Sequence, residues 1–186
     1  MGIIALSYLG VNSDKIDDWS SFASDKLGMQ KVDITSKSLF FRMDDQKQRF
    51  SVTGDEGDCL SYLGWEVEKK DDLKYFAEKL DKENIKVFAG NKSLSDKRFV
   101  EEMIYFYDPS DNRIELLYNP YKEKEPFKPG RPISGFKTGA CGLGHAVLHT
   151  DKISNLVPFY RDLLDFKVSD YSFDPINVYF FHVNER

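Results

Sequence analysis

Three segments of the chain repeat one layout, and this repeat constrains the fold more than any other feature. Each segment begins with alternating apolar and polar residues, continues as an amphipathic helix, and ends in further strand-like stretches. The three helices align on Phe22, Phe76 and Phe159, which are separated by 54 and then by 83 residues. The second spacing is one period plus an insertion of 29 residues. We therefore expect a β-α-β-β-β unit that occurs three times.

The first unit is expected to hold strands at residues 4–11, 31–35, 38–43 and 49–53, with a helix at 15–27. Ser13 can cap that helix and Gly28 can end it. Its apolar face is made by Ile16, Trp19, Phe22, Ala23 and Leu27. The second unit is expected to hold strands at 60–67, 85–88, 102–106 and 113–118, with a helix at 71–83 that turns Leu73, Phe76, Ala77 and Leu80 inward.

The third unit follows a linker rich in Pro and Gly, so we place a domain boundary near residue 133. Residues 1–133 would form an N-terminal two-module domain, and residues 134–186 would begin a second domain. In the third unit we expect strands at 144–150, 167–172 and 178–183 and a helix at 152–164. By the length of the repeat, the third unit lacks its last strand and a fourth unit is missing. We therefore expect a fragment of a longer protein.

The composition excludes several classes of protein. Aromatic residues make up 15% of the chain, which argues against disorder, and the net charge of −5 argues against nucleic acid as the main partner. The sequence contains neither a long apolar stretch that could cross a membrane nor a secretory leader. Cys59 and Cys141 are far apart, so we expect reduced thiols and a cytoplasmic protein.

All three histidines lie in the third unit, as His145, His149 and His182. On a strand, side chains four residues apart share a face but lie about 13 Å apart, so His145 and His149 cannot bind one ion together. His145 is either a ligand for a metal such as iron or zinc or a structural histidine. We expect His149 to be a solvated or hydrogen-bonded strand residue, and His182 to lie either in a pocket wall or in a plain core strand. Glu115 lies between apolar residues and has no histidine near it in the first two units, so we expect an exposed or paired carboxylate.

Several motifs resemble one enzyme family. They are residues 134–139 (Ser-Gly-Phe-Lys-Thr-Gly), 142–145 (Gly-Leu-Gly-His), 159–166 and 184–186 (Asn-Glu-Arg), with shorter matches at 64–66 and 106–110. The whole chain resembles the type I extradiol ring-cleavage dioxygenases, most closely those that act on 2,3-dihydroxybiphenyl and on steroid-derived catechols. The resemblance implies an α+β, vicinal oxygen chelate (glyoxalase- and bleomycin-resistance-like) fold of repeated βαβββ modules, with the third module incomplete here.

The resemblance also implies a cofactor and a set of site residues. Family members hold non-haem Fe(II) with two histidines and one glutamate, and they cleave a catechol with O2 during the degradation of aromatic compounds. His145 matches the first iron ligand, and Val147 and Phe180 match positions in the substrate pocket. The catalytic histidine and the other two ligands fall beyond Arg186, so we expect no catalytic residue within this fragment. Glu115 is expected to be a structural relic.

The missing iron ligands and the two apolar pocket residues lead to two expectations. With one ligand of three, the 186 residues alone should be inactive, while the parent protein should prefer a catechol with an apolar substituent. A glyoxalase-like enzyme on the same fold, or a binding module without enzymatic activity, stays open as an alternative. Open sheet edges also favour a homo-oligomer.

Overall fold

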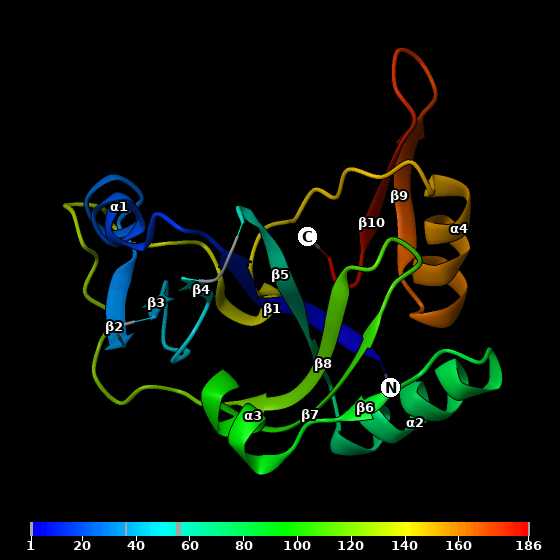
Figure 1. The fold of residues 1–186 in the computed structure, drawn as a ribbon, viewed down its shortest axis with the longest axis horizontal. Coiled ribbons are helices and arrows are strands. Elements are labelled where there is room, and N and C mark those ends of the chain that lie inside the picture. The colour runs from blue at the N-terminus through cyan, green and yellow to red at the C-terminus, as the bar shows by residue number, and fades with distance from the viewer. Residues whose placement is uncertain (1, 36, 55–56, 186) are drawn as a thin grey trace.

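The computed structural model describes residues 2–35, 37–54 and 57–185. Most of the described strands form a single mixed sheet in the order β2-β3-β4-β1-β5-β8-β7-β6, and β9 pairs with β10 separately. Figure 1 shows the long central strands crossing the molecule and the β9–β10 hairpin projecting from it beside α4. The sheet order mirrors itself about the β1–β5 pair, so the first two units are related by a local two-fold axis.

Unit one has its strands where the repeat predicts them. Its elements are β1 (Ile3–Asn12), α1 (Ile16–Ser21), the π-helical segment η1 (Phe22–Lys26), β2 (Gln30–Thr35), β3 (Ser38–Arg42) and β4 (Phe50–Thr53). Gly28 follows the helix with a φ of +84°, which suits a helix end. The prediction that Phe22 and Leu27 face inward is wrong, because they are 46% and 36% exposed. The Trp19 ring packs on Phe50, and Phe22 meets the Trp19 ring edge to face while remaining partly exposed. Leu27 follows the π-helical segment, which alters the 3.6-residue period.

Unit two repeats this arrangement. Its elements are β5 (Cys59–Val67), α2 (Lys70–Lys82), β6 (Phe88–Ala89), α3 (Lys92–Arg98), β7 (Val100–Tyr107) and β8 (Arg113–Pro120). Helix α2 buries Leu73, Phe76 and Leu80, as its periodicity predicts. The strand expected at residues 85–88 is reduced to β6, and α3 was not expected. The Asn91 side chain caps α3 by accepting a hydrogen bond from the Leu94 N–H at 2.9 Å.

Strands β1 and β5 pair antiparallel through a repeated tetrapeptide. The sequence Ser-Tyr-Leu-Gly occurs at residues 7–10 and again at 61–64, one period apart. Tyr8 lies opposite Gly64, Tyr62 lies opposite Gly10, and Leu9 lies opposite Leu63 on the local axis. The two tyrosine rings meet edge to face, with centroids 5.7 Å apart. Each glycine leaves the space that the tyrosine of the other unit fills.

Unit three is incomplete as a sheet. It contains the short helix η2 (Gly139–Cys141), α4 (Ile153–Pro158), the π-helical segment η3 (Phe159–Leu163), β9 (Lys167–Ser172) and β10 (Val178–His182). The strand predicted at residues 144–150 is wrong, because this segment carries no strand assignment. Its counterpart β1 lies between β4 and β5. The corresponding neighbours, a fourth strand of unit three and the first strand of a further unit, do not occur among the described residues.

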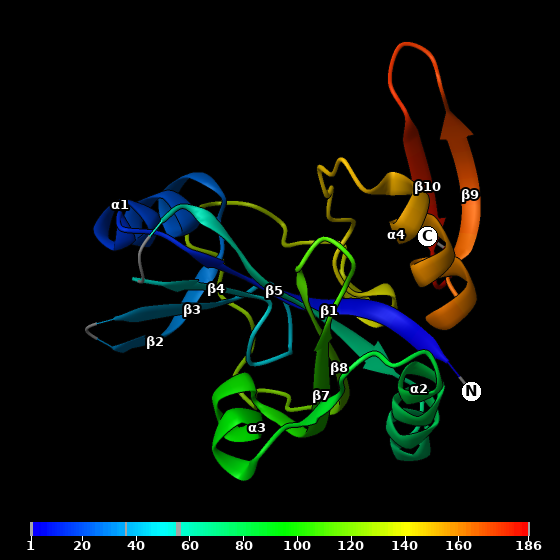
Figure 2. The ribbon, with the colours of Figure 1, turned by 45° about the vertical axis from the view of Figure 1, so that its right-hand side comes forward.

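Unit three packs on unit two through aromatic side chains. Phe159 contacts Phe106, and Phe166 contacts Trp65 with ring centroids 4.7 Å apart. The buried hydroxyl of Tyr160 donates a hydrogen bond of 2.9 Å to Asp108. Figure 2 shows α4 and the β9–β10 hairpin standing on one side of the large sheet. The domain division near residue 133 stays a prediction.

Two further expectations concern the chain as a whole. Cys59 and Cys141 are free thiols, as expected. Within the described ranges, no helix is long and apolar enough to cross a membrane.

The close contact between Tyr8 and Gly64 gives a stability prediction. A Cβ at Gly64 would lie 2.1 Å from the buried Tyr8 ring, whereas a Cβ at Gly144 would meet nothing within 4 Å. Gly64→Ala should lower the free energy of unfolding by about 2 kcal/mol, because the ring must move in a filled core. Gly144→Ala is the control and should leave stability unchanged. Urea denaturation measures both, and equal stability of the two variants would contradict the packing described.

Candidate active site

The expected metal ligand His145 lies on the surface in the segment that precedes α4. Its side chain is exposed, as is that of His149. His182 on β10 is partly buried, and its Nδ1 lies 2.7 Å from the backbone oxygen of Asn184. Among the residues that the structure describes, no group of three His, Cys, Asp or Glu side chains could hold a metal ion. The described residues therefore do not fit an iron site, which needs three such ligands.

The two expected pocket residues also lie on open surface. Val147 is 83% exposed and Phe180 is 53% exposed. Exposure alternates along residues 145–149, with the odd-numbered residues outside and Ala146 and Leu148 packed against the core. This alternation is that of a strand, although the segment lacks a strand partner. It puts His145 and Val147 on the same side, as predicted, and their roles as ligand and pocket wall stay predictions.

Glu115 on β8 is completely buried, and polar side chains surround its carboxylate. It accepts hydrogen bonds from Arg98 at 2.8 and 3.1 Å and from the Tyr8 hydroxyl at 2.8 Å. Arg113 lies 2.9 Å from one of its oxygens. The Arg98 guanidinium stacks over the Tyr62 ring at 3.6 Å. Both carboxylate oxygens already have cationic partners, so the expectation of a paired, structural glutamate is confirmed.

Burial and charge in this cluster shift the pKa values of Tyr8 and Arg98, which contact Glu115. Burial raises the pKa of the Tyr8 hydroxyl well above its usual value, and the Glu115 charge raises it further. Burial alone would lower the pKa of Arg98, but Tyr62 and Glu115 outweigh it and the pKa is raised. Tyr8 therefore stays a neutral donor and Arg98 stays charged. The cluster joins β1, α3 and β8 and stabilises the centre of the paired units.

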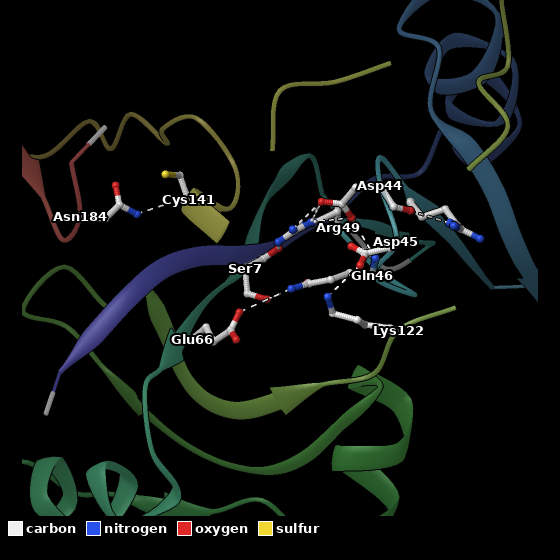
Figure 3. A network of polar contacts seen from close by, with 10 residues as sticks. Ser7, Asp44, Asp45, Gln46, Arg49, Glu66, Lys122, Cys141 and Asn184 are labelled. Carbon is white, nitrogen blue, oxygen red and sulfur yellow. Dashed lines mark hydrogen bonds and ion pairs between the residues drawn. The ribbon is translucent and has the colours of Figure 1, made fainter. Parts of the chain in front are cut away.

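A second polar network joins the connection between β3 and β4 to β1 (Figure 3). The Arg49 side chain donates to both oxygens of Asp44 and, at 2.8 Å, to the backbone oxygen of Ser7. Gln46 bridges the Ser7 hydroxyl to Glu66 on β5, at 3.1 and 3.5 Å. Burial alone would raise the pKa of Asp44, but the hydrogen bonds and charge of Arg49 outweigh it and lower the pKa. Burial raises the pKa of Glu66, whose one hydrogen bond in this network is long.

The last part of the chain is bound to the first strand. The Asn184 side chain donates to the backbone oxygen of Ile4 at 2.7 Å and to that of Cys141 at 3.2 Å. The Leu143 N–H donates to the Leu6 oxygen at 2.8 Å. Strand β1 is irregular at these points, since its register against β5 shifts after Ile3 and again after Leu6. Such bulges leave carbonyl groups for partners outside the sheet, and the linker and unit three use them.

Sequence reasoning missed the partners of Glu115 and the contact of Asn184. The repeated Ser-Tyr-Leu-Gly was a signal for Tyr8 and Tyr62, because a glycine two residues after a tyrosine in both copies predicts mutual packing. Arg98 is the last residue of α3, a helix that was not expected and that ends with Phe99 at a φ of +54°. A bulky residue rarely adopts such a conformation, so the sequence offered little sign of it.

The hydrogen bond from Tyr8 to Glu115 gives a second prediction. Tyr8→Phe removes a buried donor to a charged acceptor and should lower the free energy of unfolding by about 2 kcal/mol. Tyr107→Phe removes the hydroxyl of an exposed tyrosine and serves as the matched control. Urea denaturation measures both. A Tyr8→Phe protein as stable as the control would show that the hydrogen bond from Tyr8 to Glu115 does not contribute to stability.

The pKa of Glu66 gives a prediction about pH. Because that pKa is raised in the folded state, folding takes up a proton between the ordinary and the raised pKa, and stability falls as pH rises through this window. Glu66→Gln cannot ionise, so its stability relative to the unchanged protein should grow between pH 4 and pH 7. Glu123→Gln is the control: a hydrogen bond from the Lys124 N–H lowers the pKa of Glu123, so the relative stability of this variant should not grow with pH. A pH-independent difference for Glu66→Gln would contradict the assignment.

Comparison with known proteins places these features in a family. The family model described as "Dihydroxybiphenyl dioxygenase BphC D1" matches residues 6–54. Biphenyl-2,3-diol 1,2-dioxygenase of Metapseudomonas furukawaii is 36% identical over 193 residues, which cover 100% of this chain and 64% of that relative. A 1,2-dihydroxynaphthalene dioxygenase of Sphingobium xenophagum is 33% identical, covering 97% of this chain and 63% of that protein.

Solved structures agree with the sequence comparison. A crystal structure of catechol 2,3-dioxygenase superposes with a TM-score of 0.91 and 30% identity, over 100% of this chain and 68% of that one. The chain spans a little less than two thirds of the length of the two curated relatives named above. The repeat predicted the mirrored pair of βαβββ units and the start of a third, and this arrangement is the vicinal oxygen chelate fold that the family resemblance implied. The chain belongs to the extradiol ring-cleavage dioxygenase family.

Proposed function

We propose that this sequence serves in Fe(II)-dependent extradiol cleavage of a substituted catechol, with O2 as co-substrate, in the degradation of aromatic compounds. The observation that carries the proposal is the match to a biphenyl-2,3-diol dioxygenase along the whole chain. The match therefore includes the paired units and the third unit with His145. The two free thiols favour the reducing cytoplasm as its location.

His145 is the residue that we propose as an iron ligand. Its exposed imidazole is available for coordination, since its ring has no hydrogen-bond partner in the part of the chain that the structure describes. Bound iron would supply the activation of catechol and O2. The other two ligands must come from outside the described residues, because these contain no group of three ligands. We therefore propose that residues 1–186 alone have no ring-cleaving activity.

The proposed substrate class rests on two apolar side chains of unit three and on the names of the relatives. Val147 and Phe180 would give the substrate an apolar wall, and the proteins named for biphenyl-2,3-diol and 1,2-dihydroxynaphthalene are both at least 33% identical to the chain. We propose a catechol with a second ring or a similar apolar substituent in preference to catechol itself. Burial of a second ring would contribute affinity roughly in proportion to the apolar area removed from water.

A binding module without enzymatic activity is a second candidate for the isolated chain. The absence of a three-ligand group within the described residues favours it. Such a module would bind 2,3-dihydroxybiphenyl without consuming O2. Titration of the metal-free protein, followed by tryptophan fluorescence, distinguishes it from an inert fragment.

Oxygen uptake tests the proposed function. Protein with a verified mass of 21.5 kDa, loaded with Fe(II) without air, should consume no O2 when 2,3-dihydroxybiphenyl is added. A chimera that adds the unmatched portion of the Metapseudomonas furukawaii relative should consume O2, and His145→Ala in that chimera should abolish the uptake. Uptake by the 186-residue protein would contradict the proposed inactivity. Uptake that survives His145→Ala would contradict the ligand assignment.

A further inference from the structure

Polar side chains of three neighbouring strands meet at one buried place inside the first two units. Tyr8 on β1, Tyr62 on β5 and Glu115 on β8 are each at most 3% exposed. The Tyr8 hydroxyl donates to Glu115 at 2.8 Å, and the Gln48 amide donates to the Tyr62 hydroxyl at 3.3 Å. The side-chain oxygen of Gln48 is buried without a hydrogen-bond partner in the part of the chain that the structure describes. These oxygen atoms form a set of acceptors that suits a cation.

The two tyrosines hold a position of the repeat that carries a polar side chain in all three units. Tyr8, Tyr62 and His145 each lie 14 residues before the phenylalanine on which the three helices align. In units one and two this position lies on the long central strands and points a hydroxyl into the interior. The interior of the paired units is therefore the place at which the repeat gathers its polar groups.

Arg98 reaches this place from a helix that the repeat does not require. In unit one, two residues separate β2 from β3, whereas in unit two ten residues separate the corresponding strands β6 and β7 and contain α3. Figure 1 shows α3 apart from α2, on the connection that leads into β7. Arg98 is the last residue of α3 and is only 6% exposed. The strands are therefore common to both units, whereas the buried cation is an addition of unit two.

The guanidinium of Arg98 is held as a bound ligand would be. Two of its nitrogens donate to the two oxygens of Glu115, at 2.8 and 3.1 Å, which is the bidentate pairing of a guanidinium with a carboxylate. Its central carbon lies 3.6 Å from the centroid of the Tyr62 ring. Arg113 lies 2.9 Å from the same carboxylate, but its side chain is 22% exposed and covers the Tyr105 ring. Arg98 is therefore the cation that fills the interior.

We propose that the interior of units one and two is a binding site for a guanidinium cation, and that the chain supplies the occupant itself as the side chain of Arg98. The flat face of Tyr62 and the paired oxygens of Glu115 match a planar, forked cation better than a spherical metal ion. In the unchanged protein the site is filled and takes no external cation. Arg98→Ala removes the atoms of ethylguanidinium and should leave a site for that compound. The proposal does not depend on the proposed enzymatic activity.

Stabilisation by added ethylguanidinium tests the site. Arg98→Ala should lower the urea midpoint of unfolding, and about 20 mM ethylguanidinium should raise it again in a saturable way, because a ligand that binds only the folded protein stabilises it. The unchanged protein should show no such rise, since its site is filled. Arg161→Ala removes an exposed arginine that pairs with Asp162, and this matched control should not be stabilised either. An Arg98→Ala midpoint that ethylguanidinium does not raise would overturn the proposal.

Further measurements separate cation binding from the filling of space. Ethylurea has the shape of ethylguanidinium without its charge and should not stabilise Arg98→Ala, so an equal rise with ethylurea would overturn the proposal. Adding Glu115→Gln to Arg98→Ala removes the anionic partner and should abolish the rise, and a rise that persists would contradict the role of Glu115. If Arg98→Ala does not fold alone, ethylguanidinium should restore its near-ultraviolet circular dichroism. Failure to restore that signal would also overturn the proposal.

Discussion

The pairing of β1 with β5 is the interaction on which the rest of the structure depends. It joins two four-stranded halves into one sheet. At its centre, Tyr8 of unit one packs over Gly64 of unit two, and Tyr62 of unit two packs over Gly10 of unit one. The Tyr8 hydroxyl then reaches Glu115, which pairs with Arg98 at the end of α3. A backbone register, an aromatic contact and a buried ion pair therefore support one another. The buried ion pair is tolerated because its partners satisfy both carboxylate oxygens.

Unit three depends on this pair, and the described residues contain no equivalent pair within unit three. Its helix packs on unit two through Phe159 and Phe166, and Asn184 and Leu143 bind carbonyl groups of β1. These contacts account for a well-packed helix. They leave residues 144–150 without strand partners, which places His145 and Val147 on open surface. The contrast between the closed pair and the open third unit explains why the described residues do not form a metal site.

The repeat and its period were sufficient to predict the architecture. Strand–helix order, the buried face of α2 and β9 at residues 167–172 all followed from apolar spacing, because burial dictates spacing. Two kinds of feature could not be predicted from apolar spacing. Residues 144–150 alternate like a strand, yet a strand also needs neighbours, which the local pattern cannot supply. The Glu115 cluster depends on contacts between Tyr8, Arg98 and Glu115, which are far apart in sequence. The assignment of His145 rested on resemblance and remains a proposal.

Amide hydrogen exchange measured by mass spectrometry tests most directly whether the β1–β5 pair is the stable centre. If it is, the amides of β1 and β5 exchange only when the whole protein unfolds, so both strands should show the same, highest protection. Amides of β9 and β10, which form a separate two-stranded sheet, should exchange through local opening at a lower free energy. Protection of β9 and β10 equal to that of β1 and β5 would contradict the central role of the β1–β5 pair.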